Sequence, residues 1–362
     1  MSKLRVAIVG CGAVARHAHC PAWIESPWAE IVACCDPDEN SIRRLFPHTR
    51  SQVAPYPSLD ALLEHEKIDI VDICTPGFLH SEQALKAIDA GCHVLVEKPP
   101  VMNTAELRMI VDAAGRRGVN AGAMFNYRHR DLVMQISNAA AAGHIGTITR
   151  INITHHGSFV FGDAPWLWDE GRSRYLLWEF GIHFIDLLVH LLGPAESIMH
   201  VHAFAHESVG HTTDMDISVR FRSGAIGHLE IAADTTRHSS SLTRIDVYGS
   251  AQDCFVRWFP PLFRLRSGVD TPMAIMADEI RAAWSVASKL LRGEYIRHRN
   301  ISHYRCIGAY VDWIRNGGTS PLSFESIEPT ISLLELITAE VPGYNVGDRR
   351  AREMPGPKPT YV

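Results

Sequence analysis

Five short apolar segments in the first part of the chain each end at a residue that is polar or suited to contact a ligand. The segments, with the residues that follow them, are Leu4–Val9 before Gly10, Ile31–Cys35 before Asp36, Ile68–Cys74 before Thr75-Pro76, Cys92–Val96 before Glu97-Lys98-Pro99, and Val119–Phe125 before Asn126. Helix-like stretches separate them, and the clearest is Thr104–Arg117, with Asn103 as its N-cap and Gly118 as its stop. Strands that are apolar on both faces and alternate with helices predict a parallel sheet covered on both sides, which binds ligands outside the carboxyl ends of its strands.

A glycine-rich turn follows the first of these segments directly. In Gly10-Cys11-Gly12-Ala13-Val14-Ala15 the first glycine makes the tight turn and the second lets the backbone approach a pyrophosphate. The small third residue lets the helix pack closely, and the helix N-terminus then faces the phosphates. The pattern predicts a dinucleotide-binding Rossmann fold.

Asp36 ends the second strand, 24 positions after Gly12. A carboxylate there accepts hydrogen bonds from ribose hydroxyls and repels a 2′-phosphate, which favours NAD over NADP. The alternative is a surface acid in the turn Asp36-Pro37-Asp38.

The second part of the chain alternates apolar and polar residues, as antiparallel strands do. The strand-like segments are Thr147–His156, Ser197–His206, Asp214–Arg222, Ala225–Ala232 and Ser241–Tyr248, with Ser223-Gly224 as a hairpin turn. Helices are expected at Trp178–Leu192, Ala274–Leu291, His303–Arg315 and Glu325–Ala339. We therefore expect an α/β Rossmann domain followed by an α+β domain with a large, mostly antiparallel sheet. Residues 1–126 would bind NAD, residues 127–345 would bind substrate and form oligomers, and residues 346–362 would form a C-terminal tail.

Several motifs together resemble the family of glucose–fructose oxidoreductase, inositol dehydrogenase and MocA. They are Gly10–Ala15, Asp36, Thr75-Pro76 with His80, Glu97-Lys98-Pro99, Phe125-Asn126-Tyr127-Arg128, Gly181–Asp186 before Leu192-Gly193, and Trp313–Gly317 before Pro321. The resemblance reaches to about residue 340. It implies cofactor contacts from Thr75, Pro76, His80, Glu97, Lys98 and Asn126, and substrate contacts from Tyr127 and Arg128.

Lys98 is the first candidate catalytic residue, since it follows a buried strand at the expected ligand edge. An ammonium there can hydrogen-bond a substrate hydroxyl or carbonyl and favour developing alkoxide charge. The alternative is a surface lysine in a loop. The resemblance implies that Lys98 lies at the nicotinamide.

A polar stripe runs along the apolar helix predicted at Trp178–Leu192. Glu179, His183, Asp186 and His190 are spaced by four, three and four residues and share one arc of the helix. Such a stripe is costly unless it is paired or faces a cavity. One interpretation is a satisfied buried network, such as His183 with Asp186. The other is a catalytic acid/base histidine oriented by the two carboxylates, and the resemblance favours it because His183 falls on the family's catalytic histidine.

The same side chains raise the question of a metal. Glu179, His183 and Asp186 are ligand types that suit Zn or Mn, but hydride chemistry on NAD does not require one, and we expect none. We interpret His17-Ala18-His19 and His155-His156 as ordinary helix-surface and strand histidines.

Two positions depart from the family's pattern. Glu179 stands where many members have aspartate, and Gly171-Arg172-Ser173-Arg174-Tyr175 replaces a run of glycines. Arginine offers a fork of donors suited to carboxylate or phosphate, so Arg172 and Arg174 predict a substrate with a negative charge away from the reacting carbon. The alternative is that they pair with nearby acids of their own loop.

Composition excludes several classes of function. The 35 basic and 40 acidic side chains give a net charge of −5, which argues against a nucleic-acid partner. No uninterrupted apolar run of about 18 residues exists, and Val6–Val9 is too short for a signal-peptide core, so we expect no membrane span and no export. The eight cysteines form no C-x-x-C pair and predict buried thiols in a reducing cytosol. We therefore expect a cytoplasmic protein.

These observations favour an enzyme in which NAD exchanges hydride with a secondary alcohol or ketone carbon of a sugar, cyclitol or related polyol. His183 would take the hydroxyl proton while Lys98 stabilises the oxygen, with Glu179 and Asp186 positioning the pair. A redox-neutral elimination or exchange and a non-catalytic cofactor-binding sensor stay open as alternatives. The broad sheet of the second domain has one face to cover, which predicts a homodimer or homotetramer.

Overall fold

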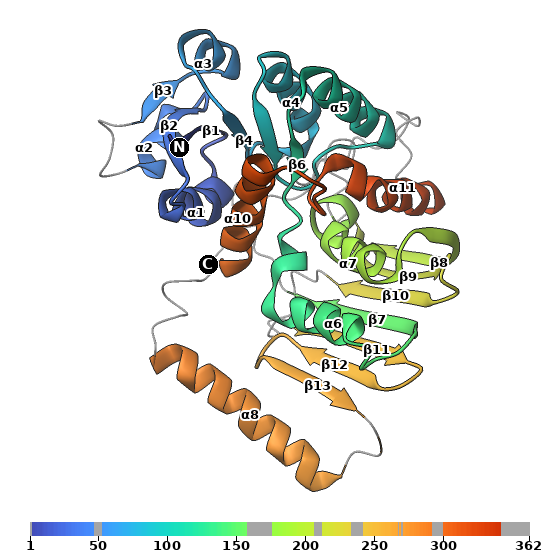
Figure 1. The fold of residues 1–362 in the computed structure, drawn as a ribbon. Helices are drawn as coiled ribbons and strands as arrows, with labels where there is room; N and C mark the ends of the chain where they lie inside the picture. The colour runs from blue at the N-terminus through green and yellow to red at the C-terminus, as the bar shows by residue number, and fades with distance from the viewer. Residues whose placement is uncertain are drawn as a thin grey trace.

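The computed structural model describes residues 2–46, 53–157, 176–205, 212–232, 242–266, 268, 271–291 and 300–341. Two sheets organise these residues, one in each half of the molecule (Figure 1). Arg172, Arg174 and the predicted tail lie outside the described residues.

The first sheet has six strands, and all of its pairings are parallel. Its order is β3 (Ala54–Tyr56), β2 (Ala29–Cys35), β1 (Leu4–Val9), β4 (Ile70–Ile73), β5 (His93–Val96) and β6 (Ala121–Ala123). This is the strand order of a dinucleotide-binding Rossmann fold. All four residues of β4 are buried, as expected for a strand with helices on both faces. The predicted α/β domain is therefore confirmed.

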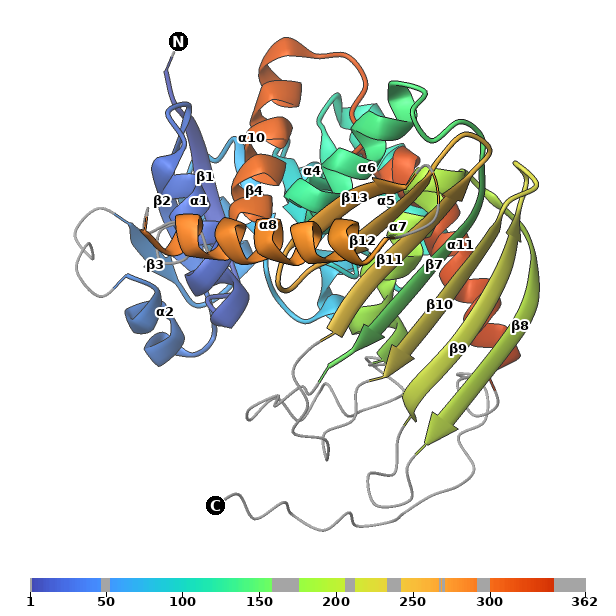
Figure 2. The same ribbon diagram turned by 90° about the horizontal axis from the view of Figure 1, so that it is seen from below.

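Helices cover both faces of this sheet (Figures 1 and 2). They are the π-helical turn η1 (Ala15–His19) with α1 (Cys20–Glu25), α2 (Glu39–Leu45), α3 (Leu59–His65), α4 (His80–Asp89) and α5 (Thr104–Arg117). The predicted ends of α5 are confirmed: the Asn103 side chain accepts a hydrogen bond from Glu106 N–H at 2.8 Å, and Gly118 has a φ of +67°.

A late helix, α10 (Ile301–Asn316), packs against the first sheet, although the sequence division groups it with the second domain. The Tyr310 hydroxyl lies 2.7 Å from the Val94 carbonyl oxygen and 3.0 Å from that of Asn120. Gly122 makes room for this ring, because a Cβ there would lie 2.6 Å from it. The C-terminal part of the described chain thus contributes to the core of the Rossmann sheet.

The second sheet has seven strands and is mostly antiparallel, as predicted. Its order is β13 (Leu262–Arg266), β12 (Asp253–Arg257), β11 (Leu242–Gly249), β7 (Ile148–His156), β10 (Ile226–Ala232), β9 (Thr212–Phe221) and β8 (Ala195–Ala205). Only the pairing of β7 with β10 is parallel among these described strands. The predicted hairpin turn joins β9 to β10, and Gly224 in it has a φ of +85°.

One face of this sheet is covered by α7 (Ile182–Leu192) and α11 (Phe324–Glu340), as Figure 1 shows. The π-helical turn η5 (Leu176–Gly181) leads into α7, so the predicted helix Trp178–Leu192 divides into two parts. The short helical turn η3 (Asn126–His129) and α6 (Asp131–Ala141) connect the two sheets, and α8 (Pro272–Leu291) follows β13. Within the described residues, no helix is both long enough and apolar enough to cross a membrane.

Candidate functional site

The glycine-rich turn has the geometry that close approach of a dinucleotide needs. Gly10 has a φ of +88°, and a Cβ there would lie 2.9 Å from the Cys74 backbone, so only glycine fits. A Cβ on Gly12 would meet nothing within 4 Å, which leaves its backbone open to a ligand. The helix begins at Ala13, Val14 follows, and the buried Ala15 belongs to the apolar core that β1, β2, α1 and α10 share. The turn fits the phosphates of NAD.

Asp36 lies beside this turn and is held by two backbone hydrogen bonds. Its Oδ2 accepts from Cys11 N–H and its Oδ1 from Asp38 N–H, both at 2.8 Å. Each carboxylate oxygen keeps a second lone pair that can accept a hydroxyl hydrogen. The carboxylate is therefore fixed beside the glycine-rich turn, with lone pairs left to accept hydrogen bonds from a ligand.

His80 joins the loop that follows β4 to the loop that follows β5. One ring nitrogen lies 2.7 Å from the Thr75 carbonyl oxygen, and the other lies 2.8 Å from the Pro99 carbonyl oxygen. The His80 side chain is fully buried, and its polar contacts are with these two loops. These contacts hold Pro76 and the Lys98–Pro99 segment in place. Thr75 Oγ1 donates to Gln83 at 2.6 Å.

A buried polar network lies under the cofactor edge. Glu97 Oε1 lies 2.9 Å from His19 Nε2, and His19 Nδ1 lies 2.8 Å from Asp72, which also accepts from the Trp23 indole N–H at 2.7 Å. Burial, the largest single effect, would lower the pKa of His19, but Asp72 and Cys74 together outweigh it and raise that pKa well above its ordinary value. His19 is thus a buried cation between two carboxylates. Its interpretation as a helix-surface histidine was wrong.

Glu97 and Asn126, both predicted to contact the cofactor, are almost fully buried. Burial, the largest single effect, would raise the pKa of Glu97, but the hydrogen bond and charge of His19 together with the charges of His303 and Lys98 lower it strongly, so Glu97 is ionised. Its Oε2 accepts from the Lys98 backbone N–H at 2.9 Å. The Asn126 amide donates to Ser302 of α10 at 3.1 Å. In this structure both residues position the segments on which Lys98 and Tyr127 lie.

Lys98 and Glu179 meet across the two halves of the molecule. Lys98 Nζ donates to the Glu179 carbonyl oxygen at 2.8 Å and lies 3.2 Å from its carboxylate. Burial would lower the pKa of Lys98, but Glu179 and then Glu97 outweigh it and raise that pKa above its ordinary value. Burial raises the pKa of Glu179, and Lys98 only partly offsets this effect. The ammonium is therefore charged and held by a residue of the predicted stripe.

His183 lies on the same side of α7, with only 8% of its surface exposed. Its Nδ1 is buried and has no hydrogen-bond partner in the part of the chain that the structure describes, and its ring stacks on Tyr127 with centroids 3.9 Å apart and planes 13° apart. Burial, followed by the charge of Lys98, holds the pKa of His183 well below its ordinary value. The imidazole is neutral at neutral pH and can accept a proton.

Asp186 and Arg128 bind each other instead of the groups expected from the sequence. Arg128 Nε donates to Asp186 Oδ2 at 2.7 Å, and a second guanidinium nitrogen donates to Oδ1, which also accepts from Thr330 at 3.0 Å. A third donates to the Pro321 carbonyl oxygen at 2.6 Å. Both residues are buried, and each needs a partner because an unpaired charge in the interior is costly. In this structure Asp186 therefore does not orient His183, and all three guanidinium nitrogens of Arg128 donate to Asp186 or Pro321.

This pairing also bears on a metal site formed by Glu179, His183 and Asp186, because two of the three side chains have other partners. The Asp186 carboxylate is occupied by Arg128, whereas Glu179 binds Lys98. Within the described ranges, the groups whose ligand atoms lie close enough for a metal are His19, Glu97 and His303, and His19, Asp72 and Cys74.

Two residues near His183 were missed from the sequence. The Arg130 guanidinium carbon lies 4.2 Å from the ring centroid of Tyr127 and 4.1 Å from that of Trp258. Arg130 could have been found, because it follows Arg128 by two positions in the same segment. Trp258 comes from the residues after β12, and no local signal points to it.

Comparison with known proteins agrees with this geometry. Residues 4–125 match the model of an oxidoreductase family with an NAD-binding Rossmann fold, and residues 133–253 match the GFO/IDH/MocA C-terminal domain. The chain belongs to the Gfo/Idh/MocA oxidoreductase family. The predicted resemblance is confirmed, and residues 4–125 form an NAD-binding Rossmann domain.

Two similar proteins are named as dehydrogenases of a glucoside and of a sugar. The chain is 30% identical over 212 residues to D-glucoside 3-dehydrogenase of Escherichia coli (strain K12), covering 56% of this chain and 58% of the relative. It is 30% identical over 197 residues to D-apiose dehydrogenase of Paraburkholderia graminis, covering 53% and 51%. The chain thus spans between half and three fifths of the length of these relatives.

A solved structure shares the whole fold. The WlbA dehydrogenase from Bordetella pertussis, in complex with NADH and UDP-GlcNAcA, superposes with a TM-score of 0.78 over 93% of this chain and 95% of its own. The sequences are 20% identical, so this likeness concerns the architecture.

Proposed function

We propose that the protein is an NAD-dependent dehydrogenase or reductase acting on a secondary alcohol or ketone carbon of a sugar, cyclitol or related polyol. The observation that carries the proposal is a charged Lys98 held by Glu179, close enough for its charge to lower the pKa of His183, whose buried Nδ1 has no hydrogen-bond partner among the described residues. NAD, when bound, accepts hydride from the substrate carbon or, in its reduced form, returns it. The turn at Gly10–Ala15 and the carboxylate of Asp36 would hold it.

His183 is the proton acceptor in the direction of alcohol oxidation. A neutral imidazole that lacks a hydrogen-bond partner at Nδ1 can take the hydroxyl proton as hydride leaves the carbon. Stacking on Tyr127 fixes the plane of the ring. In the direction of ketone reduction the imidazolium returns the proton.

Lys98 supports the oxygen on which charge develops. Its ammonium has three donors, and Glu179 engages it through the carbonyl and carboxylate oxygens. A substrate oxygen that approaches Nζ gains a charge-assisted hydrogen bond that strengthens as the alkoxide forms. Glu179 positions the ammonium, and Asp186 supports the site indirectly through Arg128.

The experiment is a panel of sugars, cyclitols and polyols, each assayed with NAD and with NADP while the absorbance of the reduced nicotinamide is followed. Wild-type turnover on at least one member, lost in His183→Ala, supports the proposal. Turnover by none of the panel in either direction contradicts it. No contact among the described residues favours a redox-neutral elimination or exchange, or a non-catalytic cofactor-binding sensor, over this function.

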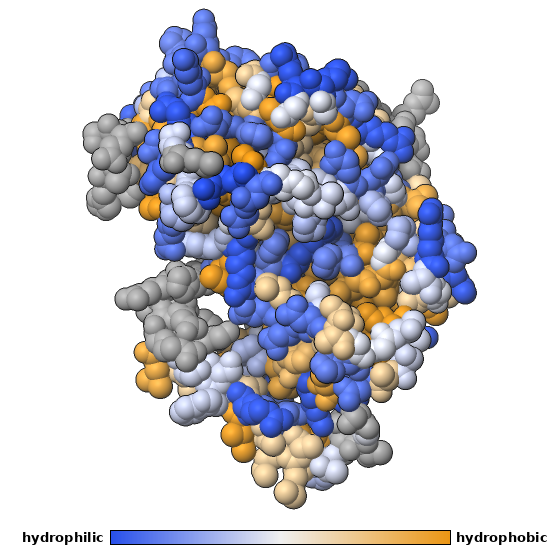
Figure 3. All heavy atoms as spheres, viewed as in Figure 1, coloured by the Kyte–Doolittle hydropathy of each residue, from blue (hydrophilic) through white to orange (hydrophobic). Residues whose placement is uncertain are grey.

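We also propose that the chain forms a homodimer or homotetramer through apolar surface that includes α8. Met273, Met276, Ile280 and Trp284 lie on one side of this helix at intervals of three and four residues, and each is at least 60% exposed. Figure 3 shows apolar side chains along this lower edge of the molecule. Exposed apolar stripes of this kind mark interaction surfaces. Analytical ultracentrifugation of wild type and Ile280→Glu tests the proposal.

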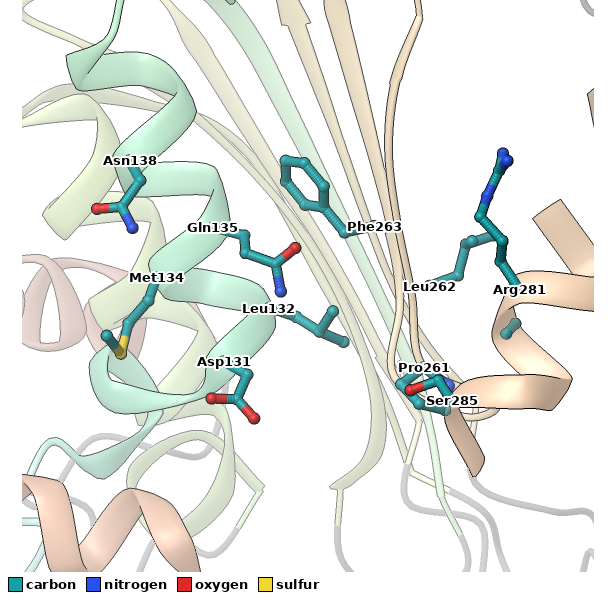
Figure 4. A pocket seen from close by; sticks show the side chains of 11 residues that line it. Asp131, Leu132, Met134, Gln135, Asn138, Pro261, Leu262, Phe263, Arg281 and Ser285 are labelled. Carbon is teal, nitrogen blue, oxygen red and sulfur yellow. The ribbon is translucent and has the colours of Figure 1, made fainter. Parts of the chain in front are cut away.

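A cavity next to α8 shows that this helix is not fully packed against the described part of its own chain. A cavity of about 500 Å³ lies between α6, β13 and α8, where Leu132 and Gln135 face Phe263 (Figure 4). Its lining does not include Lys98 or His183. We regard this cavity as part of the surface around α8 and not as the substrate site.

A cytoplasmic location remains part of the proposal. All eight cysteines are free and buried. Free thiols are typical of a reducing compartment. Fractionation of cells that express the tagged protein would test the location.

A further inference from the structure

We propose that the substrate of this reaction carries an anionic group, a carboxylate or a phosphate, which binds Arg130 in the corner between Tyr127 and Trp258. This inference rests on the function proposed above and names the class of substrate. It follows from the position of Arg130 against two rings, from the absence of an ion pair to it among the described residues, and from the stacking of His183 on one of the same rings.

Two aromatic rings hold the Arg130 guanidinium. Its central carbon lies 4.2 Å from the Tyr127 ring centroid and 4.1 Å from the Trp258 ring centroid. The two rings meet edge to face, with centroids 5.0 Å apart and planes at 77°. Contact with ring faces stabilises a guanidinium without using its N–H groups. Those donors are left for a ligand.

Arg130 and Trp258 each have a donor that no described residue satisfies. Arg130 Nε and Trp258 Nε1 are both buried and lack a hydrogen-bond partner within the described ranges. Buried donors without acceptors are costly, and proteins keep few of them outside functional sites. Arg128 is the contrast within the same segment, since three of its nitrogens donate to Asp186 and Pro321. Two unsatisfied donors on adjoining side chains indicate a ligand rich in acceptors.

The neighbouring acid does not neutralise Arg130. Asp131, the next residue, forms an ion pair with Arg305 at 2.5 Å. No ion pair joins Arg130 to any described carboxylate. Its charge therefore acts on the site, and after burial and Lys98 it contributes to the lowered pKa of His183. An anion is the ligand that this charge would favour.

The corner lies close to the reacting groups. His183 stacks on one face of Tyr127 at 3.9 Å, so Arg130, at 4.2 Å from the same ring, occupies the other face. One aromatic ring separates the guanidinium from the imidazole. A carboxylate or phosphate on the sugar that carries the reacting carbon could reach across this separation. Arg130, a described residue, is thus the proposed binding partner for the negative charge that the sequence predicts on the substrate.

Calorimetry on the NAD-saturated protein tests the inference directly. The probes are D-glucuronate, D-glucose 6-phosphate and D-glucose, which share a ring and differ in the presence and kind of anion. We expect one of the anions to bind at least about tenfold tighter than glucose. Arg130→Met should weaken the binding of that anion by about 10- to 100-fold, the effect of losing a charged hydrogen bond, and should weaken the binding of glucose much less. The preferred anion distinguishes a carboxylate from a phosphate.

Two further variants keep the test specific. Trp258→Phe retains the ring and removes the N–H, so it should weaken anion binding by a smaller factor. Arg108→Gln removes an exposed charge paired with Glu328 on the surface and should change nothing. If glucose binds as well as both anions, or if Arg130→Met binds the anion as tightly as wild type, the inference is wrong. Absence of turnover with selective anion binding intact would instead count against the proposed function alone.

Discussion

Lys98 Nζ lies 2.8 Å from the carbonyl oxygen and 3.2 Å from the carboxylate of Glu179, which joins the Rossmann edge to the helix that carries His183. The two residues are 81 positions apart in the chain. The contact brings an ammonium and a neutral imidazole to the same region. Each of the following predictions tests one part of this arrangement.

Removal of either reacting group should abolish most of the activity. Lys98→Met and His183→Ala should each lower kcat by about a hundredfold or more, the usual size of a lost general acid or base. NAD binding, measured by calorimetry, should survive in His183→Ala because that residue lies on α7. Lys86→Met is the matched control, since Lys86 lies on the surface of α4 and pairs with Asp60 and Glu82. Near-normal kcat in His183→Ala would make the histidine structural.

The pH profile should respond to Glu179. Its carboxylate raises the pKa of Lys98, so the ammonium stays charged to a higher pH than an ordinary lysine. Glu179→Gln removes that effect, and the alkaline fall of kcat/KM should move to lower pH. The acid limb should not move with it, because the lowered pKa of His183 has burial and Lys98 as its main causes. An alkaline limb at the same pH in both proteins would show that Lys98 does not control it.

Asp36 should decide between the two nicotinamide cofactors. We expect NAD to bind at least about tenfold tighter than NADP, which corresponds to about 1.4 kcal/mol. Asp36→Asn keeps the shape and loses the charge, so the ratio of the two dissociation constants should narrow. Asp38→Asn, which alters the neighbouring cap of α2, serves as the control. Equal affinities in the wild type would contradict the assigned role of Asp36.

Asp186 should matter for stability. Asp186→Asn leaves the buried Arg128 without its anionic partner and should lower the free energy of unfolding by about 3–5 kcal/mol. Asp89→Asn, at an exposed ion pair with Arg117, should change it by no more than about 0.5 kcal/mol. Urea denaturation measures both. If Asp186→Asn is as stable as wild type but has lost turnover, the structural role is wrong and Asp186 has the catalytic role expected from the sequence.

The features that local patterns determine could be predicted from the sequence. The glycine turn, both caps of α5 and the hairpin at Gly224 depend on neighbouring residues, and each is found as expected. The short strands β3, β12 and β13 were missed, since their segments of three to five residues carry little periodic signal.

Contacts between distant residues could not be predicted in the same way. Asp186 was expected to pair with His183 on its own helix, but its partner Arg128 comes from η3. His19 was taken for a surface residue, although its spacing of four from Ala15 and from Trp23 places it on the buried side of its helix. Its partners Asp72 and Glu97 come from different strands, so their charges become relevant only in the folded protein.

The central claim is that His183 and Lys98 handle the proton while NAD handles the hydride. Its most direct test is a single-turnover measurement with wild type and His183→Ala, using the best substrate of the panel and the same substrate deuterated at the reacting carbon. The account predicts reduction of NAD by the wild type, slowed by deuterium, and a rate lower by about a hundredfold or more in the variant with NAD still bound. Equal rates in the two proteins, or no reduction of NAD by the wild type with any substrate, would contradict it.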